Sequence, residues 1–304
     1  MDAIEIDGLT KKFGDVLALD HLNLTVKKNS VFGFLGPNGA GKTTTLRLLV
    51  GLAKPTSGTA KILGYNIKSQ INKIYPRIGF LPDIPVFYGW MTAKEYLNFV
   101  ADIFKIPHKK REKKIDYLLE ITNLKEVKTK IKGYSRGMKK KLGIAQALIN
   151  DPEVIFMDEP TSALDPIGRK EILEMMTSLG KETTVFFSTH ILNDVERICD
   201  SVAILHEGRL VTEESLESLK TKYSKPIFTL EFDDRPDKLT KILKNMPWIE
   251  NIEQYNNALK VTSKNLKMGQ KELPNLIAKS NLSLKSFQIE EPSLEDIFVK
   301  IVGG

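Results

Sequence analysis

The stretch GPNGAGKT, from Gly36 to Thr43, decides the fold of this chain. It follows the short apolar run Val31–Leu35 and leads into a helix-like segment, Thr44–Leu49. A strand, a glycine-rich loop and a helix in this order, with the spacing G-x-x-x-x-G-K-[ST], are typical of a phosphate-binding P-loop. The alternative, a glycine-rich turn that binds nothing, leaves the match at every fixed position unexplained.

Each residue type in this loop has a physical role. Glycine allows a backbone with positive φ, so that successive N–H groups can point inward toward an anion. The start of the following helix adds further N–H donors and the positive end of a dipole. Lys42 supplies a charge for the β- and γ-phosphates, and Thr43 supplies a hydroxyl for Mg²⁺. The predicted nucleotide ligands are Gly36, Pro37, Asn38, Gly39, Ala40, Gly41, Lys42, Thr43 and Thr44.

The composition is that of an ordinary core-forming protein. The 304 residues are 41% hydrophobic and 27% charged, which suits one large domain or two ordinary ones. The net charge of +7 is compatible with an anionic membrane surface or with nucleic acid and decides neither. The one cysteine, Cys199, excludes an intramolecular disulfide and fits a cytosolic setting.

The sequence also indicates how the protein could meet a membrane. The N-terminal residues MDAIEIDGLTKKFG include early acidic residues and no apolar core of signal-peptide length. No apolar run approaches the roughly 18 residues that are needed to span a bilayer. We therefore expect the protein to work on a membrane only through a partner.

Helices and apolar strands alternate in the middle of the chain. Val154–Met157 is a continuous apolar run, as expected of a buried parallel strand, and ends on Asp158 and Glu159. A second such run, Val185–Phe187, leads to His190. Alternating strands and helices predict a parallel sheet covered on both faces, with ligands at the carboxyl ends of its strands. We expect Asp158 to bind Mg²⁺ and Glu159 to act as a general base, rather than a merely solvated acidic pair.

Two further segments are interpreted from their residue patterns. Residues 4–26 are predicted to form short strands with turns, and Phe13 is either a packed loop aromatic or a platform for a nucleotide base. Thr92, with Glu95 three residues later, predicts a capped helix start. Aromatic residues are dense from 87 to 104, which favours a small helical core over a groove for a partner helix. The residues that carry the helical period there are Tyr96, Phe99 and Ile103.

A second domain is predicted at the C-terminal end. The composition becomes linker-like near Lys220–Pro226, which places the domain boundaries at 1–220 and 226–304. The segments that follow have the order βαββαβ of a small α+β, ferredoxin-like unit. They are Ile227–Phe232, Pro236–Asn245, Ile249–Gln254, Ala258–Thr262, Leu266–Ser280 and Leu284–Ile289, with a last helix starting near Ser293.

The stretch Tyr134–Met138 points to a family. It is similar to the signature motif of ABC ATPases, usually Leu-Ser-Gly-Gly-Gln, and matches it at Ser135 and Gly137. Together with the P-loop and the acidic pair, it makes the chain resemble the ATP-binding subunits of ABC transporters. Its departures from the motif, and the terminal segment Glu291–Phe298, are similar to the subfamily that exports drugs and antibiotics. The lysine run Lys139–Lys141 after the signature is predicted to lie on the solvent face of a helix.

The resemblance implies a fold and a set of site residues. The fold is an α/β P-loop NTPase with a parallel sheet core, an antiparallel β subdomain and a helical subdomain at about 86–148. His190 resembles the switch histidine and Phe13 the aromatic that stacks on the base. Asp165 lies in the D-loop, the segment Ser162–Asp165. The signature residues would contact ATP from a partner subunit, and they are Ser135, Arg136 and Gly137.

One position departs from the family pattern. Asp83 follows Gly79-Phe80-Leu81-Pro82, where the family usually has a glutamine that contacts Mg²⁺ and reports to the membrane partner. Aspartate is shorter than glutamine and charged. Asp83 is predicted as a metal-site residue with Thr43 and Asp158, and its full equivalence to the glutamine stays open.

The resemblance also implies cofactors and partners. ATP and Mg²⁺ are the cofactors, and two subunits, expected to be identical copies, would close head to tail around two ATPs. The membrane partner would be a separate integral permease, so the chain is expected in the cytoplasm, peripheral on the inner face of the cell membrane.

Two other functions were weighed against this one. One is a soluble ABC-type ATPase acting on nucleic acid or ribosomes, but no long coiled coil separates Lys42 from Ser135 and the chain has one cassette. No specific nucleic acid partner is therefore expected. The other makes the C-terminal domain a ligand-sensing module that switches the ATPase.

Overall fold

The computed structural model describes residues 2–223, 226–290 and 293–302. The chain divides into two compact units, Met1–Leu216 and Glu217–Gly304. Within the described ranges, no helix is both long enough and apolar enough to cross a bilayer.

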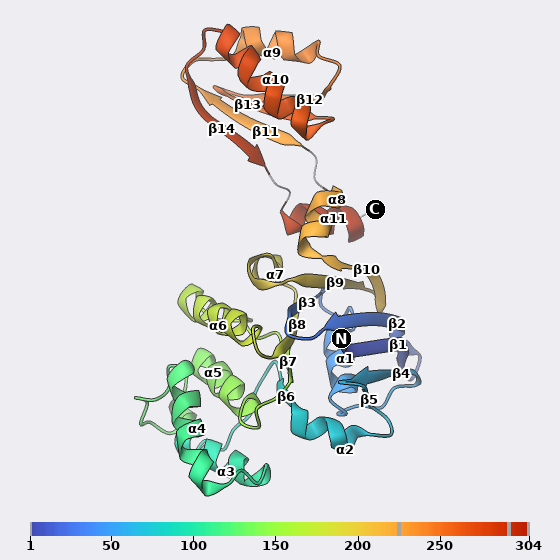
Figure 1. Ribbon diagram of the computed structural model, residues 1–304, viewed down its shortest axis with the longest axis vertical. Coiled ribbons are helices and arrows are strands. Elements are labelled where there is room, and N and C mark those ends of the chain that lie inside the picture. Colours follow the sequence, from blue (N-terminus) through green and yellow to red (C-terminus); the bar gives the residue numbers. More distant parts are fainter. Residues whose placement is uncertain (1, 224–225, 291–292, 303–304) are drawn as a thin grey trace. The chain divides into compact units, whose positions relative to one another are not determined.

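A six-stranded sheet forms the centre of the first unit (Figure 1). Its order is β10-β9-β3-β8-β7-β6, and all neighbours are parallel except the edge pair β10 and β9. The parallel core confirms the predicted fold class. The strands are β3 (Val31–Leu35), β6 (Ile78–Leu81), β7 (Val154–Asp158), β8 (Thr184–Thr189), β9 (Ser201–His206) and β10 (Arg209–Ser215). Every residue of β3, β7 and β8 is buried, as expected for strands covered on both faces.

An antiparallel sheet of order β2-β1-β4-β5 forms the second layer. Its strands are β1 (Asp2–Phe13), β2 (Val16–Lys27), β4 (Ser57–Ile62) and β5 (Tyr65–Asn66). The prediction of short strands in residues 4–26 was wrong, because β1 and β2 pair along nearly their whole length. Several register shifts interrupt that pairing, and Gly8 and His21 have positive φ there. These irregularities break the sequence alternation without ending the strands.

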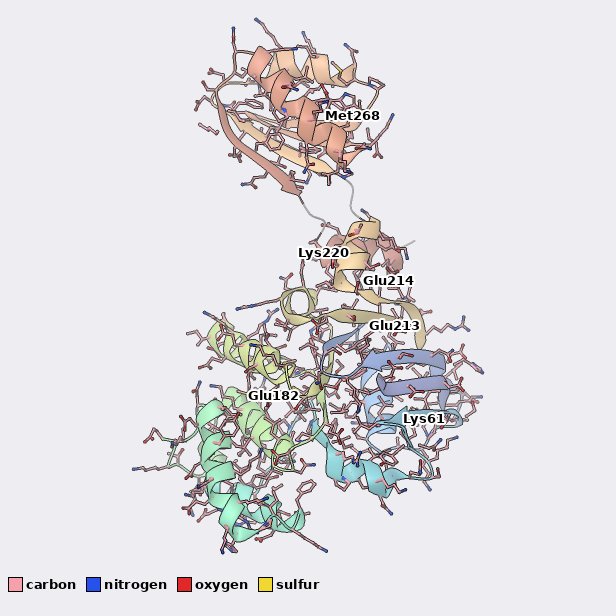
Figure 2. All side chains as sticks on the ribbon, viewed as in Figure 1. Lys61, Glu182, Glu213, Glu214, Lys220 and Met268 are labelled. Atoms are coloured by element: carbon pink, nitrogen blue, oxygen red, sulfur yellow. The ribbon has the colours of Figure 1, made fainter. Side chains whose placement is uncertain are left out.

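The two sheets are held together by α1 (Lys42–Leu49) and by polar contacts between β2 and β10, among them the ion pair of Arg209 with Asp20 at 2.8 Å. Leu46, Leu48 and Leu49 of α1 are buried in one core cluster with side chains from both sheets. Glu213 on β10, labelled in Figure 2, also accepts a hydrogen bond from the backbone N–H of Thr25 on β2, at 3.2 Å. The helix after the P-loop therefore packs against side chains of both sheets, which are also bonded to each other.

Figure 1 shows α6 and α7 on the side of the central sheet away from α1, shows α3, α4 and α5 in a lobe at the lower left, and shows α2 beside β5. The helix α3 starts with the predicted capping box of Thr92 and Glu95. Of its predicted core residues only Tyr96 is buried, whereas Phe99 and Ile103 are 39% and 62% exposed. The buried face is instead Ala93, Tyr96, Leu97, Val100 and Ala101. The helices are α2 (Ile71–Ile74), η1 (Tyr75–Arg77), α3 (Ala93–Ile103), α4 (His108–Ile121), η2 (Ile131–Gly133), α5 (Arg136–Ala147), α6 (Pro166–Leu179) and α7 (Leu192–Ile198).

The second unit contains the predicted ferredoxin-like fold. Its antiparallel sheet has the order β12-β13-β11-β14, and its core includes Phe228, Leu230, Trp248 and Leu273. The elements are α8 (Leu216–Tyr223), β11 (Ile227–Phe232), α9 (Asp237–Lys244), β12 (Ile249–Tyr255), β13 (Ala258–Ser263), α10 (Leu266–Lys279), β14 (Leu284–Glu290) and α11 (Leu294–Val302).

Two predicted features of this unit fall partly outside the described residues. Residues 220–223 belong to α8, where the composition had indicated a linker, and residues 224 and 225 are not described. Glu291 and Pro292 of the exporter-like terminal segment also lie outside the described residues. The described part of that segment starts α11, where Ser293 Oγ accepts from Asp296 N–H at 3.2 Å.

Candidate functional site

The P-loop joins β3 to α1 and needs glycine at specific positions. Gly39 and Gly41 have φ of +83° and +105°, in the region that favours glycine. A Cβ on Gly41 would lie 2.6 Å from the carbonyl oxygen of Ala18, and a Cβ on Gly36 would lie 2.4 Å from that of Leu205. The loop is therefore fixed by close backbone packing as well as by its turn conformation.

The other predicted loop residues differ in exposure. Ala40 is buried, Pro37 and Thr44 are half-buried, and Asn38 is exposed. Gly36 and Gly41 are closely packed, whereas Asn38 and Gly39 at the tip of the loop are exposed, so the backbone of the tip is accessible to a ligand.

Lys42 is buried, with 5% of its surface exposed, and its ammonium lies at the mouth of the loop. Nζ donates to the carbonyl oxygens of Gly36 at 2.7 Å and Pro37 at 3.2 Å. It also lies 3.6 Å from Oε1 of Glu159. Burial lowers the pKa of Lys42, and the Glu159 carboxylate opposes this shift. A phosphate would give this buried charge a better partner than carbonyl groups can.

The end of β7 meets the P-loop at Asp158. The hydroxyl of Thr43 donates to Asp158 Oδ1 at 3.1 Å, and the hydroxyl of Ser188 on β8 donates to the same oxygen at 2.5 Å. The structure therefore brings together the carboxylate and the hydroxyl that the sequence assigned to Mg²⁺. Both are hard oxygen donors, so the residues present fit this ion.

Glu159 directly follows β7 and has a left-handed backbone with φ of +46°. Its N–H donates to the carbonyl oxygen of Ser188 at 3.1 Å and to the Ser188 hydroxyl at 3.2 Å. Its Oε2 lies 3.0 Å from Nδ1 of His190, and its Oε1 faces Lys42. The three charged or titratable side chains predicted at three strand ends are thus in direct contact.

The lysine run after the signature was misinterpreted. Lys140 is only 5% exposed, so its prediction as a solvent-face residue was wrong. Its ammonium donates to the carbonyl oxygen of Glu159 at 2.7 Å and lies 3.3 Å from Asp83 Oδ1. Burial lowers the pKa of Lys140, and Asp83 is the main group that opposes this shift. Lys141 is mostly buried as well and pairs with Glu171 at 2.7 Å.

Asp83 lies on the loop after β6, at the same edge of the sheet as the P-loop. Its Oδ1 accepts from Lys140 Nζ and, at 3.0 Å, from the Ser162 hydroxyl. None of the interactions of the described residues joins Asp83 to Thr43 or Asp158. In this structure the carboxylate that replaces the family glutamine is engaged by a lysine.

The remaining predicted ligands face outward. Ser135 caps α5 by accepting from Met138 N–H at 3.2 Å, and both Ser135 and Arg136 are exposed. Gly137 is half-buried. Asp165 is exposed at the start of α6. Phe13 is 52% exposed at the end of β1, and Lys11 Nζ lies 4.6 Å from its ring centre.

Sequence reasoning missed a second polar cluster behind the D-loop. The hydroxyl of Thr161 donates to Asp194 Oδ2 and the guanidinium of Arg169 to Asp194 Oδ1, both at 2.6 Å. Asp194 is 1% exposed, so this paired carboxylate fixes the segment that follows Glu159 to α7. The missed Ser188 and Asp194 had one sequence signal: they lie two positions before and four positions after His190, around the end of a strand.

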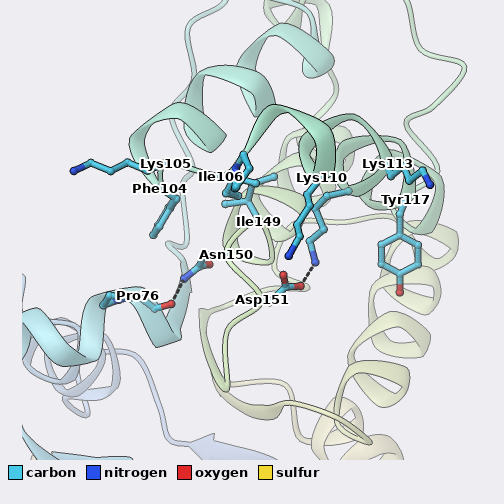
Figure 3. A pocket seen from close by; sticks show the side chains of 12 residues that line it. Pro76, Phe104, Lys105, Ile106, Lys110, Lys113, Tyr117, Ile149, Asn150 and Asp151 are labelled. Atoms are coloured by element: carbon cyan, nitrogen blue, oxygen red, sulfur yellow. Dashed lines mark hydrogen bonds and ion pairs between the residues drawn. The ribbon is translucent and has the colours of Figure 1, made fainter.

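A separate pocket of about 570 Å³ lies beside α4, away from these residues (Figure 3). Lys114 pairs with Asp151 there, and Asn150 Nδ2 donates to the carbonyl oxygen of Pro76 at 3.0 Å. None of its lining residues is a predicted nucleotide ligand. The candidate site is therefore located by its chemistry and not by the size of a hollow.

Family models match both the part of the chain that contains the P-loop and the second unit. The family model described as ABC transporter matches residues 19–162, and that described as ATP-binding protein DrrA1-3-like, C-terminal domain, matches residues 215–302. The chain is 40% identical over 304 residues to the bacitracin transport ATP-binding protein BcrA of Bacillus licheniformis, with 99% of this chain and 97% of that protein covered. The chain belongs to the ATP-binding subunits of ABC transporters.

Other members of this family give the same result. A bacitracin transport ATP-binding protein of Enterococcus faecalis is 35% identical over 305 residues, covering 99% of this chain and 96% of that protein. A solved ATP-binding subunit of an ABC transporter has a TM-score of 0.66 and 29% identity, and covers 73% of this chain and 93% of that chain.

A second solved structure concerns the reaction. It is a dimeric ATP-binding cassette in a post-hydrolysis state with ADP and phosphate, with a TM-score of 0.64 and 28% identity over 70% of this chain and 98% of that chain. As an ABC ATPase, the present chain binds and hydrolyses ATP. The alternative of an ATPase that acts on nucleic acid or ribosomes is not favoured.

Proposed function

We propose that this ABC subunit closes as a head-to-tail dimer on two ATPs and thereby drives export through a separate membrane permease. The observation that carries the catalytic part is the Glu159 carboxylate, 3.6 Å from Lys42 Nζ and 3.0 Å from His190 Nδ1. A base, a phosphate-facing cation and a histidine then lie at one edge of the sheet, beside the P-loop.

The metal ligands proposed here are Thr43 and Asp158. Their side-chain oxygens are 3.1 Å apart, so a small ion could replace the hydrogen bond between them. Bound Mg²⁺ would neutralise the charge on the β- and γ-phosphates. Asp83 stays a candidate for this site only if it leaves its ion pair with Lys140.

Glu159 is proposed as the general base. It would accept a proton from the attacking water, and His190 would hold its carboxylate and face the γ-phosphate. Lys42 is proposed to exchange its contact with Glu159 for a contact with phosphate. That exchange would free the carboxylate to act on water.

The exposed ligands support a composite site. Ser135 and Arg136 are exposed at the N-terminal end of α5, where N–H groups can meet an anion. We propose that these residues reach the ATP held by a second copy of the chain, with Gly137 allowing close approach. Phe13 would stack on the base of its own ATP, and Asp165 would lie at the dimer contact.

An apolar surface supports a membrane partner. Ile84, Val86 and Trp90 are 78%, 84% and 65% exposed. A groove of about 300 Å³ is lined by Tyr75, Phe80 and Phe104 among others, and Phe80 lies four residues before Ile84 in the chain. We propose that a helix of the permease docks here, which is the groove interpretation of this aromatic segment.

The cargo class and the location are proposed from the relatives. Two of them are named as bacitracin transport proteins, so we propose an antibiotic or similar amphiphile as cargo and export as the direction. A subunit that docks on a permease and draws on cellular ATP would work at the inner face of the cell membrane.

The P-loop assignment is tested by Lys42→Ala. ATP hydrolysis should be lost, and nucleotide binding should weaken by about 1.5–3 kcal/mol, the value of a contact to a charged group. Lys68→Ala, which removes an exposed lysine, is the control and should behave as wild type. Steady-state hydrolysis and calorimetric titration measure both effects, and wild-type turnover in Lys42→Ala would contradict the assignment.

A further inference from the structure

Four groups close a ring of polar contacts behind the acidic pair. Lys140 Nζ lies 2.7 Å from the carbonyl oxygen of Glu159 and 3.3 Å from Asp83 Oδ1. The Ser162 hydroxyl lies 3.0 Å from each of the same two oxygens and shares its proton between them. The ring therefore joins α5 to the loops that follow β6 and β7.

Burying the ammonium of Lys140 in this ring costs free energy, which its polar contacts must offset. A buried ammonium is tolerated only with a charged partner and further hydrogen bonds, and Lys140 has both. Its partner Asp83 is half exposed. The carboxylate could therefore be solvated by water, but in this structure it forms an ion pair with Lys140. Lys140 and Ser162 both donate a hydrogen bond to the carbonyl oxygen of Glu159.

The backbone of Glu159 adopts an unfavourable conformation that must be stabilised by contacts. Glu159 has a φ of +46°, a conformation that persists only when its surroundings determine it. Its N–H is held by Ser188, and its carbonyl oxygen is held by Lys140 and Ser162. The carboxylate is positioned from this backbone, so a change at the carbonyl side would turn it away from water and from His190.

We infer that Lys140 is a positioning residue: anchored by Asp83 and assisted by Ser162, it holds the carbonyl group of Glu159 and so keeps this residue in its catalytic conformation. This inference rests on the proposed role of Glu159 as the base. Because Lys140 lies on α5, the helix that Ser135 caps, the ring also connects the signature helix directly to the base of the same subunit. Asp83 acts here as the anchor of the lysine.

The first experiment compares Lys140→Met, Lys140→Gln and Lys141→Met in the full chain. Lys140→Met should lower kcat by about 10-fold or more, since small misplacement of a catalytic group has effects of this size. The KM for ATP should stay within about twofold, because the P-loop is untouched. Lys140→Gln keeps a donor for the Glu159 carbonyl and should recover part of kcat. Lys141→Met removes a comparable ion pair from the same helix, with Glu171, and should match wild type.

The outcomes separate this inference from the proposed function. Wild-type kcat in Lys140→Met, with Glu159→Gln inactive, would overturn the positioning role and leave the base intact. Equal losses in Lys140→Met and Lys141→Met, without recovery in Lys140→Gln, would reduce the effect to helix stability and also overturn it. Wild-type hydrolysis in Glu159→Gln would instead remove the proposed base itself.

A second variant decides the question if Lys140→Met does not fold. Ser162→Ala removes the other donor of the ring from a half-buried position. It should lower kcat by about threefold at unchanged KM, as expected for a group that acts after ATP binding. Combined with Asp83→Asn it should cause less than the product of the two single effects, because both act on one ring. Wild-type kcat in Ser162→Ala, or independent effects in the double variant, would overturn the inference.

Discussion

At the residue scale, the chemistry of this protein depends on how single backbone groups hold charged side chains. Glu159 has a left-handed backbone, with its N–H bound to Ser188 and its carbonyl bound to Lys140. Such a conformation costs on the order of 1–3 kcal/mol, which the surrounding contacts must offset. Lys42, held by two loop carbonyls, is in turn placed opposite the carboxylate. Both side chains are thus positioned before ATP arrives.

The residue-scale prediction concerns Glu159→Gln. Glutamine keeps the shape and hydrogen-bonding reach of glutamate but is not basic, so hydrolysis should fall by about 10²–10⁴-fold. Lys42, Asp158 and the loop amides remain, so Mg-ATP should still bind and trap an ATP-dependent dimer, visible by light scattering. Glu153→Gln, at an exposed carboxylate, is the control. Normal turnover without an ATP-induced dimer would exclude Glu159 as the base.

At the element scale, the functional groups lie at the ends of the three parallel strands β3, β7 and β8. The P-loop lies between β3 and α1, Asp158 ends β7 and Glu159 follows it, and His190 follows β8. Because β8 pairs with both β3 and β7, these three ends are adjacent. The helical lobe has its own cap, in which Thr92 and Glu95 bond each other's backbone N–H groups.

The element-scale prediction concerns that cap. Thr92→Ala should destabilise the protein by about 1 kcal/mol, the usual effect of losing a helix N-cap. ATP hydrolysis should change little, because α3 carries none of the proposed nucleotide ligands. Denaturant unfolding measures the loss, with the exposed loop residue Thr129→Ala as a matched control. Equal stability of Thr92→Ala and Thr129→Ala would show that the capping box contributes nothing.

At the scale of the whole molecule, the chain consists of two compact units, and every proposed nucleotide ligand lies in the first. The first unit has its own core around α1, and the second has its own core around β11. Separate cores are the property that allows domains to fold independently.

One prediction at this scale concerns truncation. A chain ending at Leu216 should fold and bind ATP with an affinity close to that of the full chain, because no ligand is removed. Circular dichroism and nucleotide titration measure folding and binding. An insoluble product, or one that does not bind ATP, would show that the first unit needs the second.

The other prediction at this scale concerns the dimer. Lys42→Ala and Ser135→Arg subunits should each be inactive alone, since one damages the P-loop and the other the signature. Mixed, they should recover part of the activity, because a heterodimer contains one site with both halves intact. Absence of recovery in a mixture that demonstrably forms heterodimers would contradict the composite site.

The P-loop, the parallel sheet and the polar groups at the ends of its strands could all be predicted from the sequence. This was possible because glycine spacing, apolar runs and residues that follow a strand are local properties of the chain. The same locality gave the capping box of Thr92 and the βαββαβ order of the second unit. The family followed from these motifs together with the signature at Ser135.

The pairing of polar groups across the site could not be predicted from the sequence and became known from the folded structure. Nothing local distinguishes buried Lys140 from the adjacent Lys139, because the inward direction of a helix depends on what packs against it. The engagement of Asp83 by that lysine, and of Asp158 by Ser188, joins residues 57 and 30 positions apart. Contacts at such separations are set by the register of strands and helices within the folded core, which no single segment of the sequence specifies.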